Sequence, residues 1–92
     1  MRLSFRVFGM VQGVGFRWFV KEAASSHGVT GWVRNTLDGA VEGEAQGNVP
    51  ALDAFVKSLK NGNPMARVDR AETQEMLDQE AAEKDFHIKP TV

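Results

Sequence analysis

Residues 9–17 form a glycine-rich segment, Gly9-Met10-Val11-Gln12-Gly13-Val14-Gly15-Phe16-Arg17. Before it, Leu3, Phe5 and Val7 alternate with polar residues, which predicts a half-buried strand over residues 2–8. After it, apolar residues recur at helical spacing. The first N–H groups of a helix lack intrahelical partners, and the helix dipole favours negative charge there. A strand, a glycine-rich loop and a helix start in succession therefore predict an anion-binding loop.

The groups expected to hold the anion are backbone amides and one cation. Arg17 adds a permanently charged, planar guanidinium that suits phosphate or carboxylate oxygens. The amides are those of Val11, Gln12, Gly13, Val14 and Gly15. We expect this site to hold an anion of the size of phosphate.

The segments that follow alternate between strand and helix patterns. A first helix is predicted from Phe16 to the residue before Gly28, and a second one after the N-cap Asn48, ending at residues 61–62. Between them, β-branched and aromatic residues predict strands at 29–35 and 40–46, joined by a hairpin turn at Asp38-Gly39.

The last third of the chain is more polar. A weaker strand is predicted from residue 66 to about residue 73, at a sheet edge, and a short strand at 86–89. Residues 74–85 fit either a helix or a polar loop. The whole order predicts an α+β, ferredoxin-like βαββαβ sandwich, in which two helices cover one face of an antiparallel sheet, with a short extra C-terminal strand.

Composition narrows the function. The 92 residues predict a single domain, 1–92, and the net charge of −1 argues against a nucleic-acid partner. The absence of cysteine excludes disulfides, thiolate nucleophiles and zinc–thiolate sites. No apolar run approaches the ~20 residues of a membrane span, and no signal peptide is recognisable. We expect a cytoplasmic monomer that has no membrane partner.

Three segments of the chain resemble the acylphosphatases. They are residues 11–17, Gly31-Trp32-Val33-Arg34-Asn35 and Asp38-Gly39-Ala40-Val41-Glu42, and the similarity continues to Phe86 and Ile88. The resemblance implies hydrolysis of a small acyl phosphate to a carboxylate and inorganic phosphate, with no metal and no cofactor. It also implies two catalytic residues: Arg17 binds the phosphoryl group and Asn35 positions the attacking water.

The residue types agree with that chemistry. A carboxylate leaves as the base of an acid with a pKa near ~4, so it needs no general acid at neutral pH. Neither cysteine, nor histidine, nor an Asp-x-Asp pair lies near the loop, which fits an activated substrate rather than a covalent phosphoenzyme. The carbonyl of Asn35 can accept a hydrogen bond from water, and we expect Thr36 to hold the Asn35 amide.

Two alternatives remain open at this point. One is a ferredoxin-like nucleic-acid-binding module that uses Phe16, Trp18 and Phe19 as stacking aromatics, although their spacing is helical. The other is a catalytically silent or specialised phosphate-binding relative, such as the carbamoyl-phosphate-handling domain of hydrogenase maturation proteins. Trp18 itself fits two positions, beside the acyl group of a substrate or packed on the sheet edge.

Overall fold

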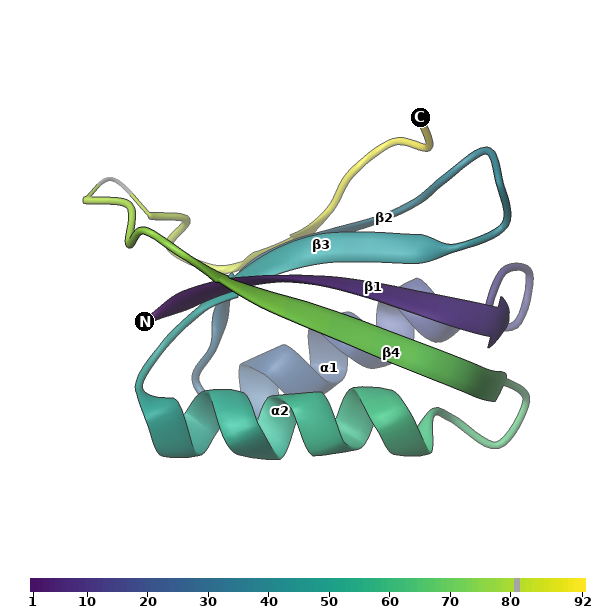
Figure 1. Cartoon of the computed structure of the whole chain (residues 1–92), viewed down its shortest axis with the longest axis horizontal. Coiled ribbons are helices and arrows are strands. Elements are labelled where there is room, and N and C mark those ends of the chain that lie inside the picture. The colour runs from purple at the N-terminus through teal and green to yellow at the C-terminus, as the bar shows by residue number, and fades with distance from the viewer. Residues whose placement is uncertain (81) are drawn as a thin grey trace.

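The computed structural model describes residues 1–80 and 82–92, which form one sheet and two helices. In chain order the elements are β1 (Arg2–Met10), α1 (Phe16–Ser26), β2 (Thr30–Asn35), β3 (Val41–Gln46), α2 (Val49–Asn61), β4 (Arg67–Met76) and β5 (Phe86–Ile88). The strand order is β4-β1-β3-β2-β5, and Figure 1 shows both helices on the same face of the sheet. The predicted α+β sandwich is confirmed, including the position of β4 at an edge.

The sheet is mixed rather than wholly antiparallel. β1 pairs antiparallel with β3 and β4, and β2 pairs antiparallel with β3, as expected. β5, however, runs parallel to β2. The reason is the path of the chain: β4 ends at the end of the sheet where β2 begins, and the chain crosses there to the opposite edge. β5 must therefore leave that end in the same direction as β2.

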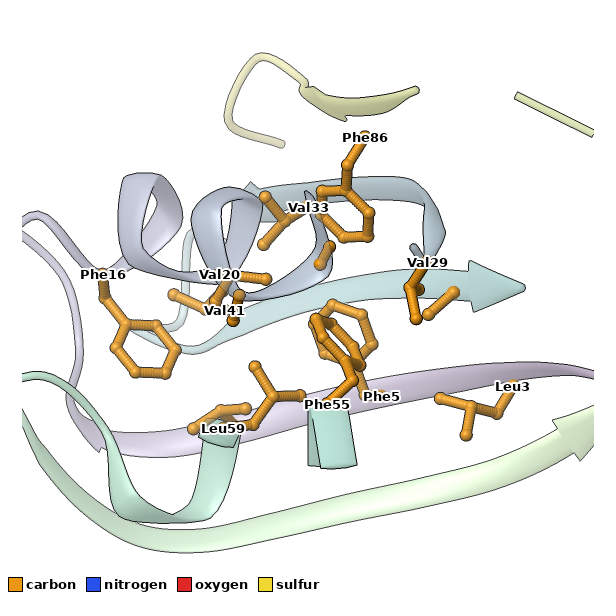
Figure 2. Packing of buried hydrophobic residues seen from close by; sticks show 14 of the residues in the cluster. Leu3, Phe5, Phe16, Val20, Val29, Val33, Val41, Phe55, Leu59 and Phe86 are labelled. Carbon is orange, nitrogen blue, oxygen red and sulfur yellow. The ribbon is translucent and has the colours of Figure 1, made fainter. Parts of the chain in front are cut away.

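The core lies between the sheet and the helices. Leu3, Phe5 and Val7 are buried as the alternation predicted, and α1 and α2 bury the apolar faces read from their spacing. Figure 2 shows the aromatic centre of this core. The ring of Phe55 lies 5.6 Å from that of Phe5, edge to face, and 5.8 Å from that of Phe86, centroid to centroid. The short β5 is thus fastened to the core by one aromatic side chain.

The ends of α2 follow the predicted signals. The side-chain oxygen of Asn48 accepts a hydrogen bond from the backbone N–H of Ala51 at 2.8 Å, and Pro50 lies in the first turn. Gly62 ends the helix at a φ of 69°. This cap places the residues after α2, including Asn63, beside the loop that follows β1.

Of the two alternatives for residues 74–85, a helix or a polar loop, the described residues of this segment form no helix, and one of them makes an ion pair that the sequence did not predict. Residues 74–76 extend β4, and 77–80 and 82–85 contain no helix; residue 81 lies outside the described residues. Arg2, expected on the exposed polar face of its strand, is 0% exposed. Its guanidinium donates to Glu44 at 2.9 Å and to both carboxylate oxygens of Glu83 at 3.1 Å. The segment before β5 therefore covers this end of the open face.

This ion pair should make folding stability depend on pH. The hydrogen bond from Arg2, together with its charge, lowers the pKa of Glu83 below its usual 4.5. As the pH falls, the unfolded chain takes up this proton first, so the stabilisation is complete above about pH 4.5 and is lost as the pH falls through the folded-state pKa. Glu83→Gln should thus be less stable than wild type at neutral pH, with the difference shrinking in acid.

The measurement is urea unfolding followed by circular dichroism, from about pH 7 to about pH 3. Glu80→Gln, the same change at an exposed carboxylate of the same segment, is the matched control. A wild-type advantage over Glu83→Gln that stays constant over this range would contradict the assignment.

Candidate active site

The loop between β1 and α1 has a backbone path that requires glycine. Gly13 and Gly15 both have a φ of 74°, in the left-handed region. A Cβ at Gly13 would meet no atom within 4 Å, and one at Gly15 would approach only Asn63, at 3.9 Å. These glycines are therefore required by backbone conformation, not by lack of space. They turn the chain from the strand direction into that of the helix within a few residues.

The start of α1 has the character of an anion site. Gly15 is the N-cap residue and makes no side-chain capping bond, and the first turn has no acidic side chain. The first intrahelical bond runs from the Phe19 N–H to the Gly15 carbonyl at 3.0 Å. The N–H groups before it are left for another acceptor, at the positive end of the helix dipole.

A cavity of about 170 Å³ lies at this helix start. It brings together residues of the loop, of α1, of the end of β2 and of β5: Val11, Gly13, Gly15, Phe16, Arg17, Trp18, Asn35 and Ile88. The cavity is smaller than the ~300–1,000 Å³ typical of drug-sized ligands, and so it suits a small anion. Arg17 and Asn35, predicted from separate segments, border the same space. Gln12, Val14 and Thr36 are not among its lining residues.

One polar atom of the Asn35 side chain has no hydrogen-bond partner within residues 1–80 and 82–92. Its carbonyl oxygen Oδ1 is buried and has no hydrogen-bond partner among the described residues. A buried acceptor left unpaired costs about 1–3 kcal/mol, so its place at a cavity wall calls for an explanation. A hydrogen-bond donor inside the cavity, such as a water molecule, would satisfy it.

Thr36 does not hold the Asn35 amide as the sequence led us to expect. Its hydroxyl donates to the Asp38 carboxylate and accepts from the Ala40 backbone N–H at 3.1 Å. The chain reverses directly after Asn35, so the buried Thr36 side chain faces the backbone of its own turn. The hydrogen bond from the Thr36 hydroxyl to the Asp38 carboxylate is also the main reason why the pKa of Asp38 is lowered. Thr36 thus stabilises the turn that follows Asn35 and acts on Asn35 only through it.

Gln12 contributes its side chain as well as its backbone. Its Nε2 donates to the carbonyls of Thr36 and Ala40, both at 2.8 Å, which ties the glycine-rich loop to the β2–β3 turn. On the other side, Asn63 Nδ2 donates to the Val14 carbonyl at 2.9 Å. The sequence predicted neither of these two side-chain contacts, which we call the Gln12 clamp and the Asn63 clamp. The only available signal was a glutamine among glycines and valines, and its partners lie more than twenty residues away.

The segment after β5 supports the end of β2. The Lys89 backbone N–H donates to the Val33 backbone carbonyl at 2.8 Å, and the Val92 backbone N–H donates to the Asn35 backbone carbonyl at 3.3 Å. The Val92 carbonyl accepts from the Leu37 N–H at 2.8 Å. In Figure 1 this segment follows β2 toward the hairpin, so the backbone of Asn35 is held from both sides.

A larger hollow of about 520 Å³ lies on the opposite, helix-free face of the sheet. Both arginines that line it are paired with the same carboxylate: Glu42 accepts from Arg6 at 2.6 Å and from Arg34 at 2.8 Å. These cations are already neutralised, whereas no acidic side chain borders the smaller cavity at Arg17. The smaller cavity is therefore the better candidate despite its size.

The aromatic residues are arranged unlike a base-stacking platform. Phe16 is 1% exposed and packs in the core, and Phe19 packs against that core. Of the three aromatics considered for stacking, only Trp18 presents a large exposed surface.

Among residues 1–80 and 82–92, no three histidine, cysteine or acidic side chains are grouped as a metal site requires. In the same part of the chain, neither helix has the length and apolar character needed to cross a bilayer.

Comparison with known proteins identifies the family. The acylphosphatase family model matches residues 3–88, which include the loop, the end of β2 and β5. The chain belongs to the acylphosphatase family. The resemblance expected from residues 11–17, 31–35 and 38–42 is thereby confirmed.

Individual relatives agree over nearly the full length. An acylphosphatase from Bacillus licheniformis is 41% identical over 88 residues, covering 94% of this chain and 97% of the relative. The crystal structure of acylphosphatase from Bacillus subtilis superposes with a TM-score of 0.90 at 40% identity, covering 96% of this chain and 97% of that one. Full-length HypF, in its phosphate- and nucleotide-bound form, contains a similar domain: the TM-score is 0.85 at 32% identity, over 98% of this chain but 12% of HypF.

The Gln12 clamp should be needed for a well-formed cavity. In Gln12→Glu, a carboxylate without donors would face the Thr36 and Ala40 carbonyls, and both would lose a hydrogen bond. We expect a loss of about 1–3 kcal/mol in the free energy of unfolding and weaker binding of inorganic phosphate. Chemical unfolding and calorimetric titration with phosphate measure the two effects.

Gln74→Glu, the same chemical change on exposed β4, serves as the control and should alter neither quantity. If Gln12→Glu bound phosphate as tightly as wild type, the clamp would not be required for the cavity.

Proposed function

We propose that the protein hydrolyses acyl phosphates in the cavity between Arg17 and Asn35, releasing a carboxylate and inorganic phosphate. The observation that carries the proposal is that two unlike residues line one cavity: Arg17, which carries a guanidinium, and Asn35, whose side-chain carbonyl oxygen is buried without a partner in the part of the chain that the structure describes. Membership of the acylphosphatase family supports the reaction class.

The phosphoryl group would be held by Arg17 and by the backbone amides of residues 11–15. Phosphoryl transfer passes through a loose transition state in which negative charge spreads over the equatorial oxygens, so positioning and charge stabilisation do most of the catalysis. A planar guanidinium and amides fixed by Gln12 and Asn63 offer such stabilisation without rearranging during the reaction.

The attacking water would be held by Asn35. Its Oδ1 accepts one water hydrogen and orients the oxygen toward phosphorus. The water oxygen forms a bond to phosphorus while the bond from phosphorus to the acyl oxygen breaks, and the carboxylate leaves with that electron pair. The water proton passes to a phosphoryl oxygen of the substrate. Because a carboxylate is a weak base, no protein acid is needed, and we propose that the reaction needs no metal either.

We further propose that a single copy of the chain is active. One chain already brings Arg17, Asn35 and the glycine-rich loop to a common cavity, and hydrogen bonds within the chain brace Asn35 and the loop. The substrate would be a small molecule whose phosphoryl group lies in the cavity of about 170 Å³.

The two residues should separate by their effects. Arg17→Ala should lower kcat/KM by about 10³-fold or more and also weaken inhibition by inorganic phosphate, since its guanidinium binds the phosphoryl oxygens in both cases. Asn35→Ala should lower kcat strongly and leave phosphate inhibition near the wild-type level. The assay is hydrolysis of benzoyl phosphate in EDTA, with p-nitrophenyl phosphate as a stable ester for comparison.

Glu42→Gln, on the opposite face of the sheet, controls for general damage to β2 and β3. An Asn35→Ala variant with wild-type kcat and weakened phosphate inhibition would contradict the assigned role. Phosphate binding without turnover in the wild type would instead indicate a phosphate-binding relative that has lost catalysis.

A further inference from the structure

Two large apolar side chains border the candidate cavity and remain open to solvent. Trp18 is 59% exposed and Ile88 is 39% exposed, and both line the cavity together with Arg17 and Asn35. Other exposed apolar side chains, such as Leu77 and Met65, lie outside it. The cavity therefore combines the polar side chains of Arg17 and Asn35 with two large apolar side chains that form its solvent-exposed rim.

Trp18 lies at this rim because of its place on α1. Phe16 and Val20 point into the core, so Trp18, two positions from each, lies on the outer side of the first helical turn. The Lys21 ammonium, three residues on, lies 5.3 Å from the centre of the Trp18 ring. A cation at this distance from an aromatic ring helps to hold it in place. The indole lines the cavity together with Ile88 of the edge strand β5, so the two positions considered for Trp18, at the substrate site and at the sheet edge, lie in the same place.

Ile88 reaches the same cavity from another part of the fold. It is the last residue of β5 and pairs with Val33 of the parallel neighbour β2. Phe86, two residues earlier in the strand, is anchored against Phe55 in the core. Ile88 is thereby fixed beside the end of β2, where Asn35 lies.

We infer that Trp18 and Ile88 form a subsite for the acyl group, and that the protein favours acyl phosphates whose acyl group is apolar, above all aromatic. This inference rests on the proposed function. An acyl phosphate has a charged end, which Arg17 and the loop amides suit, and an acyl end that must leave the cavity through its rim. An aromatic acyl group that covers the Trp18 ring removes apolar surface from water and gains contact between rings.

The test compares two substrates that share the reacting group. The ratio of kcat/KM for benzoyl phosphate to that for acetyl phosphate is measured in wild type, Trp18→Ala, Trp18→Phe and Ile88→Ala. The intrinsic reactivity of the two substrates is the same in every variant. A change in the ratio therefore reports the contribution of the substituted rim residue to the recognition of the acyl group. We expect Trp18→Ala to lower the ratio about tenfold, Ile88→Ala to lower it less and Trp18→Phe to preserve most of it.

Leu77→Ala removes an apolar side chain that is 90% exposed and outside the cavity, and it should leave the ratio unchanged. Binding of phenylphosphonate relative to methylphosphonate, measured by calorimetry, repeats the test without turnover. Phenylphosphonate should bind more tightly in the wild type, and this preference should be lost in Trp18→Ala.

The outcomes separate the subsite from the reaction. Turnover of both acyl phosphates with an unchanged ratio in Trp18→Ala would overturn the subsite and leave the proposed function standing. No turnover of either substrate, but a preference for phenylphosphonate that Trp18→Ala abolishes, would overturn the proposed function and support the subsite.

Discussion

The two hydrogen bonds from the Gln12 side chain to the Thr36 and Ala40 carbonyls hold the site in one piece. The loop that carries the amides and the strand that carries Asn35 are distant in sequence, and each ends where regular backbone pairing stops. Without a bridge their separation would vary with the motion of two loops. A glutamine amide has two donors, and here both are used on one turn. The separation between the glycine-rich loop and the end of β2 is thereby set by a side chain that does not itself line the cavity.

The fold was largely predictable because local and long-range preferences agree along most of the chain. Alternation in β1, the apolar face of α1, the Asn48 cap and the Asp38-Gly39 turn each favour the element that forms. Arg17 and Asn35 could be singled out because they lie in segments that resemble a family. That both border one cavity is a finding of the structure. Their separate roles in binding and in catalysis remain predictions.

The features that were missed all depend on partners remote in sequence. Arg2 follows the polar alternation of its strand, and nothing near it in sequence reveals that Glu83 will cover it. The parallel pairing of β5 follows from where β4 ends, which a short strand read in isolation does not disclose. Thr36 was expected to bond its neighbour in sequence, yet the turn brings the Ala40 backbone within reach of its hydroxyl. In each case the tertiary path of the chain decided which of several polar partners was used.

The position of β1 has a consequence for the synthesis of the protein. The strand made first lies inside the sheet, and its two neighbours are residues 41–46 and 67–76. While the chain emerges from the ribosome, Leu3, Phe5 and Val7 stay without their pairing partners until most of the molecule has been made. Two open strand edges and an apolar face are exposed during this interval, and such surfaces pair readily with other nascent chains. The topology that buries β1 so well in the folded protein therefore delays the pairing of its two edges until residues 41–46 and 67–76 have been made.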